Sequence, residues 1–210
     1  MSKKILTWLF SIIILASLVT ISGCTKKETA QEVEIPANYT TFTDEQGLYS
    51  ISYPSDWELL LSLLTELEQY TKDVIASMNS DAPIDQAQFL FAAGVPIESG
   101  YAPSATMGIE PMPAFIVTHN QMVDAEIDAI KQTLSDYHEY SRIKTTVGGK
   151  EATILEWEGT YPQIGKNHNL QLYILAGKNA WIIGCVPPIG EYDKWEKDFQ
   201  SIVRSLRILK

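Results

Sequence analysis

Histidine, cysteine and acidic side chains are the groups in this sequence that could perform chemistry. The chain of 210 residues contains three histidines, His119, His138 and His168. A metal site or a histidine acid–base pair needs two of them to converge, and isolated histidines are more often solvated surface residues. The sequence has no phosphate-binding loop and no nucleophile elbow. We therefore expect no catalytic residue, no metal and no cofactor.

The acidic pairs and the second cysteine have simple structural explanations. Asp124/Asp128 and Glu156/Glu158 have the spacing of exposed positions on a helix and on a strand, respectively. Cys185 lies in "WIIGCV", where every second residue shares one face of the expected strand. A reactive thiol needs access and a lowered pKa, so we expect Cys185 to be a buried, small apolar residue.

Cys24 is different, because it ends a long apolar run near the N-terminus. Lys3 and Lys4 precede the mostly apolar residues 5–21, and the run closes with Ser22 and Gly23. A positive start, an apolar core and small residues before a cleavage point are typical of a secretory signal. Ile21 to Cys24 resemble a bacterial lipobox, which implies a lipid on the Cys24 sulfur and cleavage after Gly23. The alternative is an uncleaved anchor, because the run approaches the roughly 20 residues that span a bilayer.

The sequence thus divides into three parts. Residues 1–23 form the expected lipoprotein signal peptide, residues 24–38 a polar, flexible tether, and residues 39–210 one folded domain. We expect the protein on the extracytoplasmic side of a bacterial cell membrane, held through the lipid on Cys24. With Cys24 acylated, only one cysteine remains for the fold, which excludes an intramolecular disulfide and a cysteine-based zinc site.

The charge of the chain limits its partners. The formal net charge is −10. An acidic surface is repelled by nucleic-acid phosphates and by anionic lipid headgroups. We therefore expect no nucleic-acid partner and no binding to membranes through a basic patch.

Apolar spacing predicts the first elements of the domain. Thr40–Thr43 and Leu48–Tyr53 are expected strands around a turn, and Pro54 ends the second. Leu60–Met78 has helical spacing and predicts an amphipathic helix. Ser55 and Glu58 have the spacing of a capping box at its start.

The second half predicts a helix, an antiparallel meander and a final helix. Ala114–His119 is an expected strand, and Asn120 is the expected cap of a helix with a buried stripe from Val123 to Tyr137. Glycine-rich turns at 148–150 and 177–179 connect two pairs of alternating segments. Apolar residues from Tyr192 to Leu206 recur at helical spacing. Three helices over an antiparallel sheet make an α+β fold.

Two stretches resemble PsbP-like domains, the superfamily of an extrinsic photosystem II subunit. They are "GLYSISYPSDW", where Tyr-Pro ends a strand and a tryptophan follows, and "LYILAGKNAWIIGCVPP" with its helix "WEKDFQSIVRSLRI". The resemblance spans about Tyr39 to Leu209. It implies an antiparallel β-sheet sandwiched by α-helices, an extracytoplasmic location and usually no catalysis. The long helix at 60–78 departs from this pattern as an insertion.

One stretch has the composition of a binding loop. Gly94–Pro113 is rich in glycine and proline and carries Tyr101, Met107 and Met112 as candidate contact residues. The alternative is a surface excursion that only connects two strands. We expect a non-catalytic module that binds a protein or assembles an extracytoplasmic complex. The alternative function is a small-molecule or metal-binding module, or a hydrolase.

Overall fold

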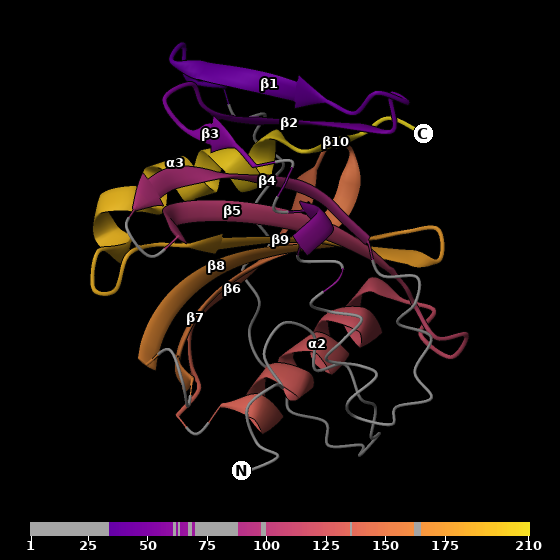
Figure 1. The fold of residues 1–210 in the computed structure, drawn as a ribbon. Helices are drawn as coiled ribbons and strands as arrows, with labels where there is room; N and C mark the ends of the chain where they lie inside the picture. The colour runs from indigo at the N-terminus through magenta and orange to yellow at the C-terminus, as the bar shows by residue number, and fades with distance from the viewer. Residues whose placement is uncertain are drawn as a thin grey trace.

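The computed structural model describes residues 34–60, 62, 64–66, 69, 88–97, 100–134, 136–161 and 165–210. Figure 1 shows a large curved sheet with a smaller sheet above it. The small sheet has the order β1-β2-β10, and the seven-stranded sheet has the order β3-β4-β5-β9-β8-β7-β6. The strand pairs recorded in both sheets are antiparallel, which confirms the predicted α+β class.

The elements follow in the order strands, helix, strands, helix, strand. Their bounds are β1 Tyr39–Thr43, β2 Tyr49–Pro54, β3 Glu58–Leu59, β4 Gln88–Ile97, β5 Gly100–Pro111, α2 His119–Thr133, β6 His138–Val147, β7 Lys150–Tyr161, β8 Gly165–Ala176, β9 Asn179–Val186, α3 Tyr192–Ser205 and β10 Arg207–Ile208.

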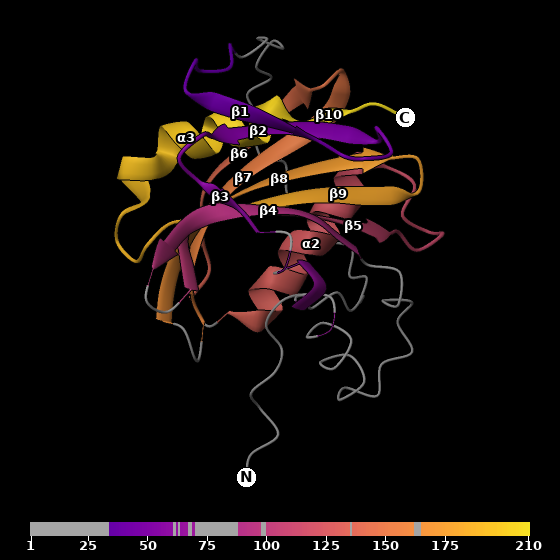
Figure 2. The ribbon, with the colours of Figure 1, turned by 45° about the horizontal axis from the view of Figure 1, so that its top comes forward.

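The large sheet lies between two covering layers. Helix α3 and the small sheet cover one face, and α2 packs against the other (Figures 1 and 2). Two hydrophobic clusters correspond to these two interfaces. Strands β8 and β9 contribute to both clusters: Leu172 faces α3, whereas Tyr173 faces α2. Because both faces are buried along β9 and the second half of β8, these stretches are apolar at most positions.

The final helix forms as its sequence predicts. Its buried residues are Tyr192, Phe199, Ile202, Val203 and Ser205. Ser205 connects the helix to β2, since its Oγ accepts a hydrogen bond from the Ser52 amide at 2.8 Å. Burying a hydroxyl is costly unless it is hydrogen-bonded, and Ser205 Oγ also donates to the Ile202 carbonyl at 2.7 Å. The helix is therefore fixed to the small sheet by apolar contacts and by this serine.

The predicted helix start at Ser55 and Glu58 is wrong. Glu58 and Leu59 form the short strand β3, opposite Gly94 and Ala93 of β4. Trp57 is buried against α3, with its ring centroid 6.4 Å from that of Phe199. This aromatic contact and the pairing with β4 keep the chain extended where the local spacing favours a helix. Of the predicted helix Leu60–Met78, residues 62, 64–66 and 69 are helical, and most of the rest lies outside the described residues.

The expected strand Ala114–His119 is also wrong. The chain turns here, with the Ile116 amide donating to the Pro113 carbonyl at 2.9 Å, and α2 already begins at His119. The N-cap of α2 is Thr118 and not Asn120. Proline at 113 favours the turn, and the apolar residues that follow it alternate between the core and solvent.

The segment Gly94–Pro113 is a hairpin and not an irregular loop. Most of it belongs to β4 and β5, which pair along their length. Register shifts between Phe89 and Phe91 and between Gly94 and Pro96 interrupt the pairing. Such bulges accommodate glycine and proline within a sheet. The prediction of a loop rested on the frequency of these two residues.

The described helices include none that is both long and apolar enough to cross a bilayer. Cys24, the expected signal peptide and most of the expected tether lie outside the described residues.

Candidate functional site

The segment Met112–Thr118, between β5 and α2, presents apolar side chains to solvent. Phe115 is 59% exposed and Val117 is 71% exposed. Met112 and Ile116, in contrast, pack against the cluster between the sheet and α2. Scattered exposed apolar residues are ordinary, but two large ones on one short, ordered segment form a candidate contact site.

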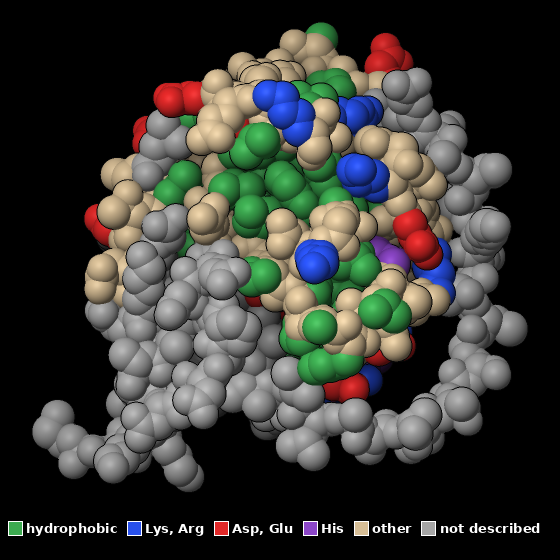
Figure 3. All heavy atoms as spheres, turned by 90° about the vertical axis from the view of Figure 1, so that its right-hand side faces the viewer, with side chains coloured by type: hydrophobic (Ala, Val, Ile, Leu, Met, Phe, Trp, Pro, Cys, Tyr) green, Lys and Arg blue, Asp and Glu red, His purple; other side chains and the backbone are tan. Residues whose placement is uncertain are grey.

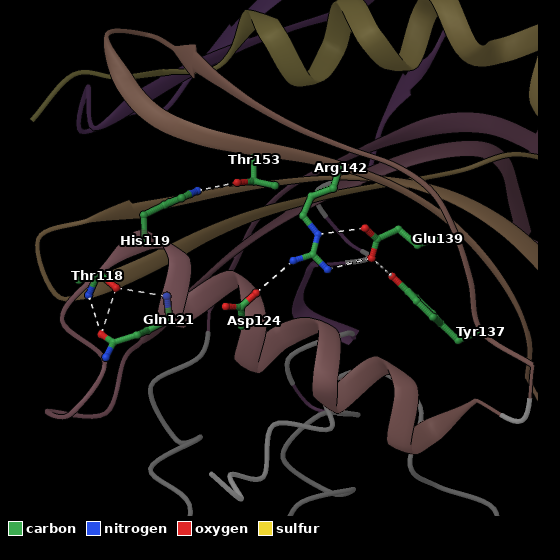
Figure 4. A network of polar contacts seen from close by, with 8 residues as sticks. All are labelled: Thr118, His119, Gln121, Asp124, Tyr137, Glu139, Arg142 and Thr153. Atoms are coloured by element: carbon green, nitrogen blue, oxygen red, sulfur yellow. Dashed lines mark hydrogen bonds and ion pairs between the residues drawn. The ribbon is translucent and has the colours of Figure 1, made fainter. Parts of the chain in front are cut away.

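Backbone contacts hold both ends of this segment. At its start, the Met112 amide donates to the Lys178 carbonyl in the β8–β9 turn at 2.8 Å. At its end, Gln121 Oε1 accepts from the Val117 amide at 3.0 Å and from the Thr118 amide at 3.1 Å. The Gln121 amide in turn donates to Thr118 Oγ1 at 3.2 Å. This capping box, shown in Figure 4, orders the backbone beneath Val117 as it starts the helix.

His119 attaches the beginning of α2 to the sheet. Its side chain is buried, and Nε2 lies 2.8 Å from Thr153 Oγ1 on β7 (Figure 4). Burial, together with the nearby Lys144, lowers the pKa of His119, and the charge of Glu151 opposes this shift only in part. The neutral imidazole is therefore a structural contact that positions the exposed segment.

Arg142 attaches α2 to the sheet further along the helix. Its guanidinium bonds to Glu139 at 2.9 and 3.0 Å and to Asp124 of α2 at 3.0 Å. Tyr137 donates to the same Glu139 carboxylate at 3.1 Å (Figure 4). Burial raises the pKa of Glu139, but its bonds to Arg142 outweigh that effect and the net shift is downward. The bidentate pair with Glu139, on the same strand, holds the guanidinium in place, and a single bond to Asp124 connects it to α2.

Several turns gather at the same end of the molecule as Met112–Thr118. The β6–β7 turn packs on the C-terminal strand, where a Cβ on Gly148 would lie 2.8 Å from the Leu206 carbonyl oxygen. The Leu209 amide donates to the Leu48 carbonyl at 2.8 Å, next to the β1–β2 turn. The β8–β9 turn adjoins Met112, as described above. These contacts place three hairpin turns and the C-terminus at one end of the fold.

We call this surface the turn-end face. Its exposed apolar residues are Phe115, Val117 and Leu209, beside the partly buried Leu48 and Met112. Its basic residues are Lys150, Lys178, Arg207 and Lys210. Figure 3 shows that apolar side chains gather on this side of the molecule with lysine and arginine around them. Leu209 is itself 53% exposed. An apolar centre with a polar rim is the usual anatomy of a protein-binding surface.

The predicted binding residues occupy other positions. Met107 is completely buried between the sheet and α3, so it cannot contact a partner in this fold. Met112 starts the exposed segment but packs inward. Tyr101 lies in β5 opposite Pro96, and its side chain is not among those described. The exposed pair lies in the run "AFIVTH", Ala114–His119, which the sequence predicts as a strand.

Two of the three histidines meet at the opposite end of the large sheet. The rings of His138 and His168 lie 4.6 and 4.7 Å from the Tyr140 ring, between centroids. His168 also stacks on Tyr192 at 3.6 Å and bonds to Glu156 at 2.9 Å. The expectation of solvated histidines is thus wrong for His168, as it is for His119. No group of three or more histidine, cysteine, aspartate or glutamate residues in the described part of the chain could hold a metal ion.

The acidic pairs differ in exposure, and Cys185 is buried. Asp124 and Asp128 are exposed as predicted. Glu156 and Glu158 are not, because each carboxylate is about one-fifth exposed. Glu158 instead bonds to Lys166 at 2.6 Å and accepts from Tyr140 at 3.3 Å. Cys185 is fully buried, as predicted, and burial raises the pKa of its thiol.

Glu110 is a buried acid that no sequence pattern indicates. Glu110 is 4% exposed, and neither of its carboxylate oxygens has a well-formed hydrogen bond. Burial raises its pKa well above the ordinary value, and the neighbouring carboxyl of Glu126 raises it further. Burial and the neighbouring Glu126 carboxyl therefore favour the protonated form of Glu110. Only the pairing of β5 beneath α2 creates this environment.

Comparison of the whole fold with solved structures identifies its type. The chain is similar to cyanobacterial PsbP from Synechocystis sp. PCC 6803, with a TM-score of 0.51 and 10% identity over 82% of this chain and 94% of that one. The chain has a PsbP-like fold. The chain is also similar to LpqN, involved in cell envelope biogenesis of Mycobacterium tuberculosis, with a TM-score of 0.52 and 12% identity over 82% of this chain and 91% of that one.

Overall sequence similarity does not place the chain in a known family. No profile of a known protein family matches the chain, and no curated protein matches its sequence. At these identities the comparison identifies the fold, which agrees with the resemblance in "GLYSISYPSDW" and in the C-terminal stretch. The contact surface must be argued from the residues of this chain.

Proposed function

We propose that this protein is a non-catalytic module that binds another protein through its turn-end face. The observation that carries this proposal is the exposure of Phe115 and Val117 on a segment whose backbone is fixed at both ends. Aromatic residues that fill a partner's pocket dominate the energy of many interfaces. A segment that is already ordered loses little conformational entropy on binding, which favours affinity.

The buried polar groups of the fold support a structural assignment. His119 and Arg142 join α2 to the sheet, and His168 is stacked between Tyr140 and Tyr192. The two histidines are groups from which an acid–base or metal site could be built, and each has a packing or hydrogen-bonding role. A binding function uses the rigid scaffold that they provide.

The N-terminal sequence supports an extracytoplasmic location for this module. We propose that a lipid on Cys24 anchors the protein to the outer side of a bacterial cell membrane, with residues 24–38 as a tether. A single lipid chain holds a protein only weakly, so two or more chains would be needed for stable anchoring. The module would then meet its partner at or near the membrane surface.

The test is co-purification of the full chain from cells after chemical crosslinking. Because Lys210 lies on the turn-end face, the affinity tag belongs in the polar segment after Cys24 and not at the C-terminus. We expect one protein to be recovered reproducibly by mass spectrometry with the wild-type chain. The Cys24→Ala variant, which cannot be lipidated at this position, should recover less of that protein. Recovery of no specific protein with the wild-type chain would contradict the proposal.

A further inference from the structure

We infer that the turn-end face selects a partner protein whose contact surface combines apolar residues with aspartate or glutamate. This inference rests on the proposed function and specifies the chemistry of the partner. It comes from the charge of the face, which is opposite to that of the chain as a whole. The full sequence contains 16 lysine and arginine residues and 26 aspartate and glutamate residues.

The basic residues of the turn-end face are not neutralised by their surroundings. In the part of the chain that the structure describes, none of Lys150, Lys178, Arg207 and Lys210 forms an ion pair. Lys210 Nζ donates to the Gln46 carbonyl at 2.7 Å, and Arg207 donates to two carbonyls at the end of α3. Neutral carbonyls position these cations and leave their charges uncompensated.

The acidic residues near this face are fewer, and one of them has a structural role. They are Asp44, Glu45 and Glu151. Asp44 Oδ2 accepts from the backbone amides of Gln46 and Leu48 at 3.0 and 3.2 Å, which closes the β1–β2 turn. Lys144, next to Glu151 beside His119, adds a further positive charge. The named residues at this end are thus five basic and three acidic, whereas acidic residues outnumber basic ones over the full sequence.

Apolar and basic groups have separate tasks in such a surface. Phe115 and Val117 would be desolvated at the centre of the contact and supply most of the affinity. The surrounding lysines would remain partly solvated, where charge complementarity steers encounter and rejects wrong partners. A basic or neutral partner would leave these charges without a counterpart, which is why the partner is acidic.

The described chain enters the domain away from the turn-end face. Tyr39, the first residue of β1, pairs with Pro54, whereas the turn at 44–47 lies at the other end of the same hairpin. Tyr39 also donates to Asp198 of α3 at 2.6 Å. The chain thus enters the domain at the end away from the turn-end face (Figure 1). The flexible tether expected between Cys24 and this point therefore leaves the turn-end face accessible to other proteins.

The test is site-specific photo-crosslinking of the full chain in cells, with benzoylphenylalanine at position 115. Position 189 is the matched control, because Ile189 is 69% exposed and precedes α3 at the opposite end. The same label is placed in the Lys150→Glu/Lys178→Glu variant and in Lys131→Glu/Lys197→Glu, which makes the same charge change on α2 and α3. Mass spectrometry identifies the adduct and its contact peptide.

We expect one protein adduct from position 115 and none from position 189, with aspartate or glutamate in the contact peptide. Its yield should fall about tenfold in Lys150→Glu/Lys178→Glu and stay unchanged in the control pair, since only the first pair faces the partner. Equal adduct yields in the two charge variants would contradict the inference of an acidic partner. They would not contradict the proposed function. An adduct with phospholipid or with a second copy of this chain would overturn the inference. No protein adduct at either position, with no co-purifying protein, would contradict the proposed function itself.

Discussion

Gln121 and Val117 are joined by a single side-chain oxygen: Gln121 Oε1 lies 3.0 Å from the Val117 amide nitrogen, one turn before it in the chain. The same oxygen also accepts from the Thr118 amide. The residue that completes the cap of α2 therefore fixes the backbone of the most exposed apolar residue on the turn-end face. Helix capping and the presentation of the contact segment are one structural feature.

Replacing Gln121 by alanine tests this link. Loss of the cap should lower the free energy of unfolding by about 1 kcal/mol, the usual cost of a capping interaction. It should also weaken partner recovery, because the freed segment loses entropy on binding. Thermal unfolding and co-purification measure the two effects. Gln132→Ala, near the other end of α2, is the control, and equal partner recovery for Gln121→Ala and wild type would refute the link.

The pH dependence of stability should contain a contribution from His119. Its folded pKa lies below the unfolded value of about 6.5, so the unfolded state takes up a proton first as the pH falls. Stability from this group is present above pH 6.5 and is lost as the pH falls toward the folded pKa. Unfolding in urea between pH 8 and pH 5 should show a smaller decline for His119→Gln than for wild type. His138→Gln, at an exposed position, should leave the His119 contribution in place.

Glu110 should act in the opposite direction. Because burial raises its folded pKa, the folded state keeps a proton that the unfolded state releases above about pH 4.3. Stability from this group is present below that value and is lost as the pH rises toward the folded pKa. Glu110→Gln should therefore raise the melting temperature more at pH 8 than at pH 4. Asp128→Asn, an exposed acid on α2, should show no such difference; a pH-independent effect of Glu110→Gln would contradict a neutral buried carboxyl.

The β6–β7 turn offers a matched pair of glycines. Gly148 and Gly149 have φ values of +56° and +77°, so alanine is strained at both positions, by about 1 kcal/mol. A Cβ at Gly148 would also lie 2.8 Å from the backbone oxygen of Leu206, whereas nothing lies within 4 Å of one at Gly149. Gly148→Ala should be the more destabilising by thermal unfolding. Equal losses would mean that the contact between this turn and the C-terminal strand is loose.

Turn residues were sufficient to predict the antiparallel meander, and the helical spacing of apolar residues was sufficient to predict the last helix. Glycines with positive φ stand at both hairpin turns and separate the strand-forming segments of β6 to β9. The stripe from Tyr192 to Leu206 determines the buried face of α3. In these regions local preference and tertiary packing agree, so the sequence is easy to interpret.

Predictions from the sequence are wrong where tertiary contacts override local preferences. At Glu58 a helix-like spacing gives way to pairing with Gly94 of β4. Glycines and prolines in β4 and β5 suggested a loop, because bulges that accommodate them leave no sequence periodicity. Phe115 and Val117 look like core residues in the sequence. Their exposure depends on the turn at Pro113 and on the cap at Thr118, which only the folded structure reveals.

The central claim is that the turn-end face binds a protein through Phe115 and Val117. The most direct measurement is the amount of partner recovered with the full-length Phe115→Ser/Val117→Ser variant, compared with wild type and with Ile189→Ser. Because both side chains are exposed, the double variant should unfold at the wild-type temperature. We predict loss of the partner for the double variant and wild-type recovery for Ile189→Ser. Undiminished recovery with the folded double variant would contradict the claim.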